Sequence, residues 1–196
     1  MRGGRRAALV VPLALALAAC LGQVGPSGSG GPPEGNPTPV PTASPFSPEA
    51  LADTLPDRVG GVIFQKFSMS GEEFLAGSAD EQFVAFLDRV GASRDDVAVA
   101  AAIGADLAGT NQASIFAFQV VGVDASTLVD EFQGGADGGT PAMTWHTSTI
   151  SGKPVQVSNT TDDFPVPVIL YPSGNVMYFI SSTDPNVLAT ILSDLP

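Results

Sequence analysis

The sequence predicts one α+β domain over residues 49–196, with a largely antiparallel sheet and helices packed on it. Helix-capping residues precede apolar residues at helical spacing, and strand-like apolar runs lie between these segments. Several of the runs follow each other across short turns, which favours antiparallel pairing because parallel strands need long crossovers. Only 14% of the residues of the whole chain are charged, which is typical of a globular rather than a disordered protein.

Four segments carry the signals of a helix start. We expect helices that begin near residues 47, 78, 124 and 184. Each start has a serine or aspartate that can cap the helix, and Pro48 fits the first turn of the first helix. We expect glycine to end the second helix at residue 91 and the third at residues 134–135. The fourth helix should reach residue 195, because its apolar residues recur at i, i+3, i+4 and i+7.

Seven runs predict strands, over residues 61–70, 96–104, 114–123, 145–150, 153–159, 166–171 and 176–182. Ser151 and Gly152 predict a two-residue hairpin turn. The run 114–123 is apolar at successive positions, which is typical of a central strand. In the run 96–104, alternate positions carry alanine, so a helix can approach that face of the sheet closely.

The order of the elements allows two diverged β(α)ββα half-repeats. Residues 60–74 resemble residues 151–164, and each segment is followed by two strands and a helix that an aspartate caps. The first half has the β-α-β-β-α-β order of a ferredoxin-like fold once the next strand is added. Chance similarity in an apolar sequence is the alternative.

The first nineteen residues have the three parts of an export signal. Three arginines lie within residues 2–6, an apolar run covers residues 7–19, and Leu17, Ala18 and Ala19 directly precede Cys20. The apolar run is too short for a spanning helix, which needs about 20 residues. Cys20 is the single cysteine of the chain, so an intramolecular disulfide is excluded.

Leu17-Ala18-Ala19-Cys20 resembles the lipobox of bacterial lipoproteins. The resemblance covers only the start of the chain, and it implies that the sulfur of Cys20 receives a diacylglyceryl group and that the chain is cut before this residue. Two or more acyl chains would anchor the protein stably, because each buried methylene contributes about 0.8 kcal/mol. A plain secretory signal, or a buried cysteine in a short helix, is the alternative.

Residues 20–48 are expected to form a tether. They are rich in glycine, serine, threonine and proline and carry one charge, Glu34, so they cannot bury enough apolar surface to fold. A coil of about 28 residues reaches roughly 30 Å, which is enough to lift a domain off a membrane. Recognition of the proline-rich part by a partner is a second possibility.

Charge limits the possible partners. Without the three leader arginines, five basic residues oppose twenty acidic ones, so the net charge is 5 − 20 = −15. Such a surface repels phosphate backbones and anionic headgroups, so we expect no nucleic-acid binding and membrane attachment only through the lipid at Cys20. We therefore expect the protein at the cell membrane, on its extracytoplasmic face, with a partner that the sequence does not identify.

Residues with catalytic potential are few. Three acidic pairs occur, Glu72-Glu73, Asp95-Asp96 and Asp162-Asp163. The first and third occupy matching points of the half-repeats and are the speculative acidic positions for a carboxylate site. None has the spacing of a calcium loop, and solvated turns or strand ends are the simpler interpretation.

Other motifs are weaker still. His146 is the single histidine, and we expect it to be a half-exposed strand residue. The glycine-rich segment 133–139 has no lysine and follows a helix, so it lacks the geometry of a phosphate-binding loop. We expect no metal, no cofactor and no catalytic site. A glycosylation motif at residues 159–161 carries little meaning in a bacterial exported chain.

Three functions remain open. The first is a membrane-tethered envelope lipoprotein with a non-catalytic binding or interaction domain. The second is a carrier that holds an apolar ligand or lipid between the sheet and the helices, which an enclosed cavity would favour. The third is a carboxylate-based hydrolase, which requires acidic residues with raised pKa values to meet in one cleft.

Overall fold

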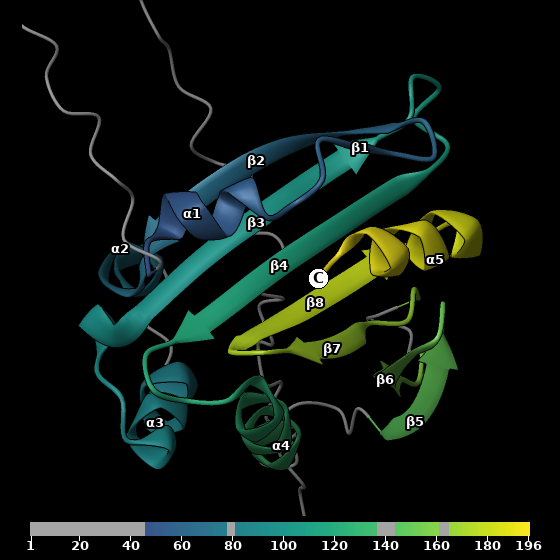
Figure 1. Ribbon diagram of the computed structural model, residues 1–196. Coiled ribbons are helices and arrows are strands. Elements are labelled where there is room, and N and C mark those ends of the chain that lie inside the picture. Colours follow the sequence, from purple (N-terminus) through teal and green to yellow (C-terminus); the bar gives the residue numbers. More distant parts are fainter. Residues whose placement is uncertain (1–45, 78–80, 137–143, 161–164) are drawn as a thin grey trace, which may run out of the picture. The chain divides into compact units, whose positions relative to one another are not determined.

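A single antiparallel sheet organises the described part of the protein (Figure 1). The computed structural model describes residues 46–77, 81–136, 144–160 and 165–196. The elements are α1 (Pro48–Asp53), β1 (Arg58–Val59), β2 (Val62–Ser70), α2 (Gly71–Gly77), α3 (Glu81–Val90), the 3-10 turn η2 (Arg94–Asp96), β3 (Val97–Ala105), β4 (Gln112–Val120), α4 (Ala125–Ala136), β5 (Trp145–Ile150), β6 (Lys153–Ser158), β7 (Ile169–Ser173), β8 (Val176–Ser182) and α5 (Pro185–Asp194). The α+β class with an antiparallel sheet is confirmed.

The strand order in the sheet is β1-β2-β3-β4-β8-β7-β6-β5, and every neighbouring pair is antiparallel. The strand predicted to be central, now β4, pairs with β3 on one side and with β8 on the other. The predicted hairpin turn is also confirmed, because Ser151 and Gly152 both have positive φ, as a type I′ turn requires. The strand predicted from residue 166 begins later, at Ile169.

Side-chain alternation divides the core between the two faces of the sheet. On one face, α1 and α5 pack over the sheet (Figure 1), and α1 lies against the alanines of β3, as the small side chains predict. On the other face, α2, α3 and α4 pack over one end of the sheet. We call these the α1/α5 face and the α2–α4 face.

Local signals explain most of the helix ends. The Ser47 hydroxyl accepts the N–H of Ala50, and an Asp184 carboxylate oxygen accepts the N–H of Asn186. Gly91, with a φ of 71°, follows the last residue of α3. The capping box predicted at residues 78–81 begins outside the described residues. The expected stop of α4 at residues 134–135 is wrong, because the helix continues to Ala136.

The first half has the expected β-α-β-β-α-β order of elements, but its strands are not paired as in a ferredoxin-like fold. In that fold the two strands that flank the first helix are parallel and a third strand separates them. Here β2 pairs directly and antiparallel with β3, and α2, α3 and η2 lie between these two strands in the chain. The chain therefore has the expected order of elements but a different pairing of strands.

Candidate binding face

The two faces of the sheet are covered to different degrees. Among the described residues, the cluster on the α1/α5 face contains twenty-two buried residues and only four half-buried apolar side chains at its border. The cluster on the α2–α4 face contains eleven buried residues and eleven half-buried ones. The helices therefore close the first face and leave part of the second face open to solvent.

Five apolar side chains mark the open part of the α2–α4 face. We call them the open face: Ile63, Phe67, Ile103, Phe116 and Phe179. The first three are 42%, 39% and 38% exposed, and the two remaining phenylalanines are half-buried. These side chains lie on neighbouring strands and together form an exposed apolar patch, which makes this part of the sheet the candidate interaction surface.

Strand register places three of these residues in one row. Phe67 lies opposite Ala101, which lies opposite Phe116, which in turn lies opposite Phe179. The small side chain of Ala101 separates two aromatic rings on strands that are roughly 10 Å apart across β3. The row continues through Leu170 and Gln156 to Thr147, so it crosses the sheet from β2 to β5.

The open face carries no charge. Its polar neighbours on the same side of the strands are Gln65, Ser114 and Ser181, and the two serine hydroxyls lie 3.1 Å apart in a hydrogen bond. None of the residues of β2, β3, β4 and β8 is acidic, and their one basic residue, Lys66, lies on the α1/α5 face. A neutral, apolar surface suits a neutral, apolar binding partner.

The turn between β3 and β4 extends beyond the end of the sheet at which β2 begins. Leu107, in the turn between β3 and β4, is 95% exposed. Asp106 holds this turn, because its carbonyl oxygen accepts the N–H of Gly109 and its carboxylate accepts the N–H of Thr110 at 2.8 Å. Ile63 lies opposite Ala105, two residues before this leucine. The turn therefore adds an exposed apolar side chain close to the open face.

Aromatic contacts hold the covered end of the α2–α4 face. Phe118 of β4 packs edge-to-face with Phe74 of α2 at 5.5 Å and with Phe179 of β8 at 5.4 Å. Phe179 in turn meets Phe132 of α4 at 4.7 Å, and Phe132 meets Trp145. This network fixes the edge of the open face on a rigid support, which favours recognition without rearrangement.

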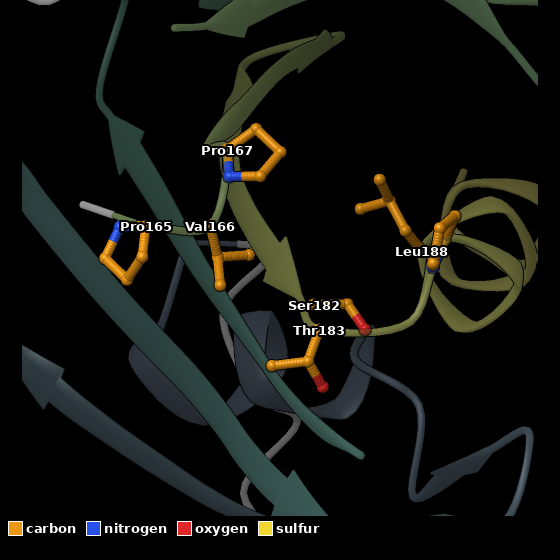
Figure 2. Close-up of a pocket in the computed structure, with 7 residues that line it drawn as sticks. Pro165, Val166, Pro167, Ser182, Thr183 and Leu188 are labelled. Atoms are coloured by element: carbon orange, nitrogen blue, oxygen red, sulfur yellow. The ribbon is translucent and has the colours of Figure 1, made fainter. Parts of the chain in front are cut away.

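A hollow of about 260 Å³ lies at the rim of the sheet (Figure 2). Its walls are the segment 165–167, the end of β8 and the start of α5; the lining residues are Pro165, Val166, Pro167, Ser182, Thr183, Pro185 and Leu188. The hollow opens to solvent, and its volume lies just below the range of about 300–1,000 Å³ that is usual for small-molecule sites.

The predicted acidic positions do not form a described site. Glu72 and Glu73 lie in the first turn of α2, where the sequence predicts a turn or a strand end. The carboxylate of Glu73 accepts the backbone N–H and the hydroxyl of Ser70, at 2.9 and 3.0 Å, and these bonds hold the pKa of Glu73 below its usual range. A catalytic acid needs the opposite shift. Asp162 and Asp163 lie outside the described residues.

Asp95 and Asp96 have a structural role as well. Both lie in η2, where the Asp96 carboxylate accepts the hydroxyl and the N–H of Ser93, and these bonds lower the pKa of Asp96. His146 is an exposed residue of β5, on the opposite side of that strand from Trp145. Within the described ranges, no group of three His, Cys, Asp or Glu side chains is placed to hold a metal ion.

The open face was missed in the sequence analysis. Apolar residues at alternate positions of the run 61–70, including Ile63 and Phe67, were the available signal, but they equally describe a covered strand. The leader residues Leu17, Ala18, Ala19 and Cys20 and the tether lie outside the described residues. None of the helices that the structure describes combines the length and the apolarity needed to span a bilayer. No protein-family model, no curated protein and no solved structure matches this chain.

Proposed function

We propose that this chain is a lipid-anchored bacterial envelope protein with a non-catalytic binding domain. Residues 1–19 would be removed as the export signal, Cys20 would carry the lipid, and residues 20–48 would tether the domain 49–196 on the extracytoplasmic face of the membrane. The open face would be the binding surface, and its partner would present a neutral, apolar surface.

The exposure of Ile63, Phe67 and Ile103 is the observation that carries the proposal. These side chains stand side by side on β2 and β3, on a face that lacks charge and that the helices leave uncovered. Burying such side chains in a complex contributes roughly 25 cal/mol for each Å² of apolar area removed from water. A protein that never buried this patch would gain nothing from keeping it apolar.

Binding of the neutral apolar dye Nile red tests the open face. The full chain should enhance the dye's fluorescence, and the double variant Phe67→Ser with Ile103→Thr should lose most of that enhancement. Val121→Ser is the matched control, because Val121 is 49% exposed but follows β4 at the other end of the strand. Equal dye binding by the double variant and the control would contradict the proposal.

Mass spectrometry of the native protein tests the anchor. We expect a chain that begins at Cys20 with diacylglyceryl on its sulfur, and a Cys20→Ala variant that is no longer recovered with membranes. An uncut leader, an unmodified sulfur or a membrane-bound variant would remove the tether from the proposal but leave the open face as a binding surface.

Neither alternative function gains support. The hollow beside Pro165 and Leu188 is open and small, whereas a carrier needs an enclosed cavity. A hydrolase needs paired carboxylates, and Glu73 is engaged by Ser70 instead.

We also propose that the two halves of the sheet derive from one duplicated unit. One half of the sheet consists of β1 to β4 and the other of β5 to β8, each in chain order from an outer edge toward the centre. The two halves meet where β4 pairs with β8. A two-fold axis through that pair would place α4 and α5 on the same face, yet they contact opposite faces. The duplication would therefore have been followed by a move of one helix. An experimental structure in which the two four-strand units fail to superpose would contradict this origin.

A further inference from the structure

The β5 strand forms a free edge of the sheet. It is the last strand in the sheet order, and within the described residues it pairs only with β6 (Figure 1). An edge strand presents a row of unpaired N–H and C=O groups, which is a template for pairing with another chain. The edge lies at the opposite end of the Phe67 row from β2, so it is a separate surface from the open face.

The hairpin turn fixes which backbone groups of β5 face outward. Around a two-residue turn, the flanking residues Ile150 and Lys153 form a hydrogen-bonded pair, and alternate pairs along the ladder do the same. His146, Ser148 and Ile150 therefore bond to β6. Just before β5, the N–H of Asn159 donates to the carbonyl of Thr144. Thr144 is two residues before His146, so this bond continues the same alternation.

It follows that the N–H and C=O groups of Trp145, Thr147 and Thr149 point away from β6. Ser158 of β6 lies opposite Trp145, and its N–H donates to the carbonyl of Val168 rather than to Trp145. Trp145 and Ser158 are therefore a pair without hydrogen bonds between them, as the alternation predicts. Outward groups recur at every second residue, about 6.6–6.8 Å apart, which is the repeat of an extended peptide.

The edge lacks the usual protection against pairing. Natural edge strands carry lysine, proline or a bulge. The other edge of this sheet follows that rule, because β2 contains Lys66, which forms an ion pair with Asp57 at 2.8 Å, and the short β1 covers its start. In contrast, β5 contains no proline and no Asp, Glu, Lys or Arg over its six residues.

The edge is also held in place before any partner arrives. The Trp145 ring packs edge-to-face on Phe132 of α4 at 6.3 Å, and the side chains of Thr147 and Gln156 share a hydrogen bond at 3.1 Å. At the turn, the Ser151 hydroxyl donates to the carbonyl of Ala189 in α5. A preformed strand gives up little conformational entropy when a peptide adds to it.

We propose that the β5 edge binds an extended segment of a partner protein, which adds to the sheet as a ninth strand. Charge favours a neutral or basic segment, because the chain without its leader carries −15. The same charge disfavours a second copy of this chain, since two equally acidic domains repel each other. Alternate side chains of the segment would lie beside Thr147 and Thr149 on one face, where β-branched residues pair well.

Amide hydrogen exchange on the full chain in detergent tests the edge directly. In the free protein, the amides of Trp145, Thr147 and Thr149 should exchange fast, and those of His146, Ser148 and Ile150 slowly. The probe is a synthetic peptide of alternating valine and threonine with a lysine at each end. At about nine-tenths saturation it should slow the three outward amides about tenfold, because only the free fraction exchanges.

Three controls separate this binding from other contacts. A peptide methylated on every backbone nitrogen, which blocks both of its edges, should fail to slow the amides, and a version with terminal glutamates should bind more weakly. The Thr147→Pro variant should stay folded, because the lost N–H points outward, but it should no longer bind the probe. Slow outward amides in the free chain, no protection by the lysine peptide, or a dimer in sedimentation would each overturn the proposal.

Discussion

Phe116 of β4 lies directly opposite Phe179 of β8, at the line where the helices cease to cover the sheet. Phe179 touches α4 through Phe132, while Phe116 is half-buried and the next residue on its face, Ser114, is polar. One step along β4 in the other direction, Phe118 is buried under α2 and α3. The boundary between the packed core and the exposed part of the sheet thus falls within one strand.

This boundary predicts unequal effects for two identical substitutions on β4. Phe118→Ala should lower the free energy of unfolding by about 3–5 kcal/mol, because it removes a buried ring and its contacts with three other rings. Phe116→Ala should cost clearly less, since its ring is already half in water. Urea unfolding of both variants measures the difference. Equal losses would show that Phe116 is core rather than surface.

Replacement of glycine by alanine should have opposite effects on stability at two helical positions, Gly71 and Gly134. A Cβ on Gly71 would lie 2.3 Å from the carbonyl oxygen of Arg94 and 2.6 Å from Cβ of Val97, and neither atom is at the end of a flexible side chain. Gly71→Ala should therefore destabilise the protein by about 1–3 kcal/mol through overpacking.

Gly134 is the matched control for this substitution. It lies inside α4, and a Cβ added to it would have nothing within 4 Å, so Gly134→Ala should stabilise the helix by about 1 kcal/mol. Thermal unfolding should show shifts of opposite sign for the two variants. A loss of stability in both would mean that helix propensity does not govern residue 134.

The elements that depend on a few adjacent residues are the ones that the sequence predicts. Caps at Ser47 and Asp184, the turn at Ser151 and Gly152, and most strands depend on a few adjacent residues, and these were predicted correctly. α2 was missed although Ser70 and Glu73 have the spacing of a capping box, because a helix of seven residues is marginal without tertiary contacts. Its Leu75 is buried in the cluster on the α2–α4 face.

The open face could not be predicted from local signals. Whether Phe67 and Ile103 are covered depends on where the helices pack, and α5 lies on the opposite face from α4. That choice involves contacts between residues far apart in the chain, such as Val187 with Gly60. The alternation of apolar residues predicts which side chains share a face, but not which part of that face meets a helix.

The two serine–carboxylate boxes predict a pH dependence of stability. Hydrogen bonds from Ser70 lower the pKa of Glu73, and hydrogen bonds from Ser93 lower the pKa of Asp96. A lowered pKa in the folded state gives stability that is present above the ordinary values of 4.5 and 3.8 and is lost as the pH falls through the folded values.

The double variant Ser70→Ala with Ser93→Ala loses the two hydroxyl donors and keeps the backbone N–H donors, so it should unfold at a somewhat lower temperature at neutral pH, and its melting temperature should fall less steeply below about pH 4.5. Melting curves recorded at closely spaced pH values provide the comparison. Parallel curves for the variant and the unchanged chain would mean that other carboxylates dominate acid unfolding.

The β5–β6 turn provides the last prediction, which links stability to the free edge. Gly152 has a φ of 77° and no atom within 4 Å of a Cβ position, so the only cost of a side chain there is the left-handed backbone. Gly152→Ala should cost about 1–2 kcal/mol, whereas Gly152→Asn should cost less because asparagine tolerates this conformation. In Gly152→Ala the amides of His146 and Ser148 should exchange faster, since a weakened turn frays the ladder from the edge inward. Faster exchange at β3 and β4 instead would show that the hairpin unfolds only with the whole sheet, and equal costs for alanine and asparagine would show that φ is not the cause.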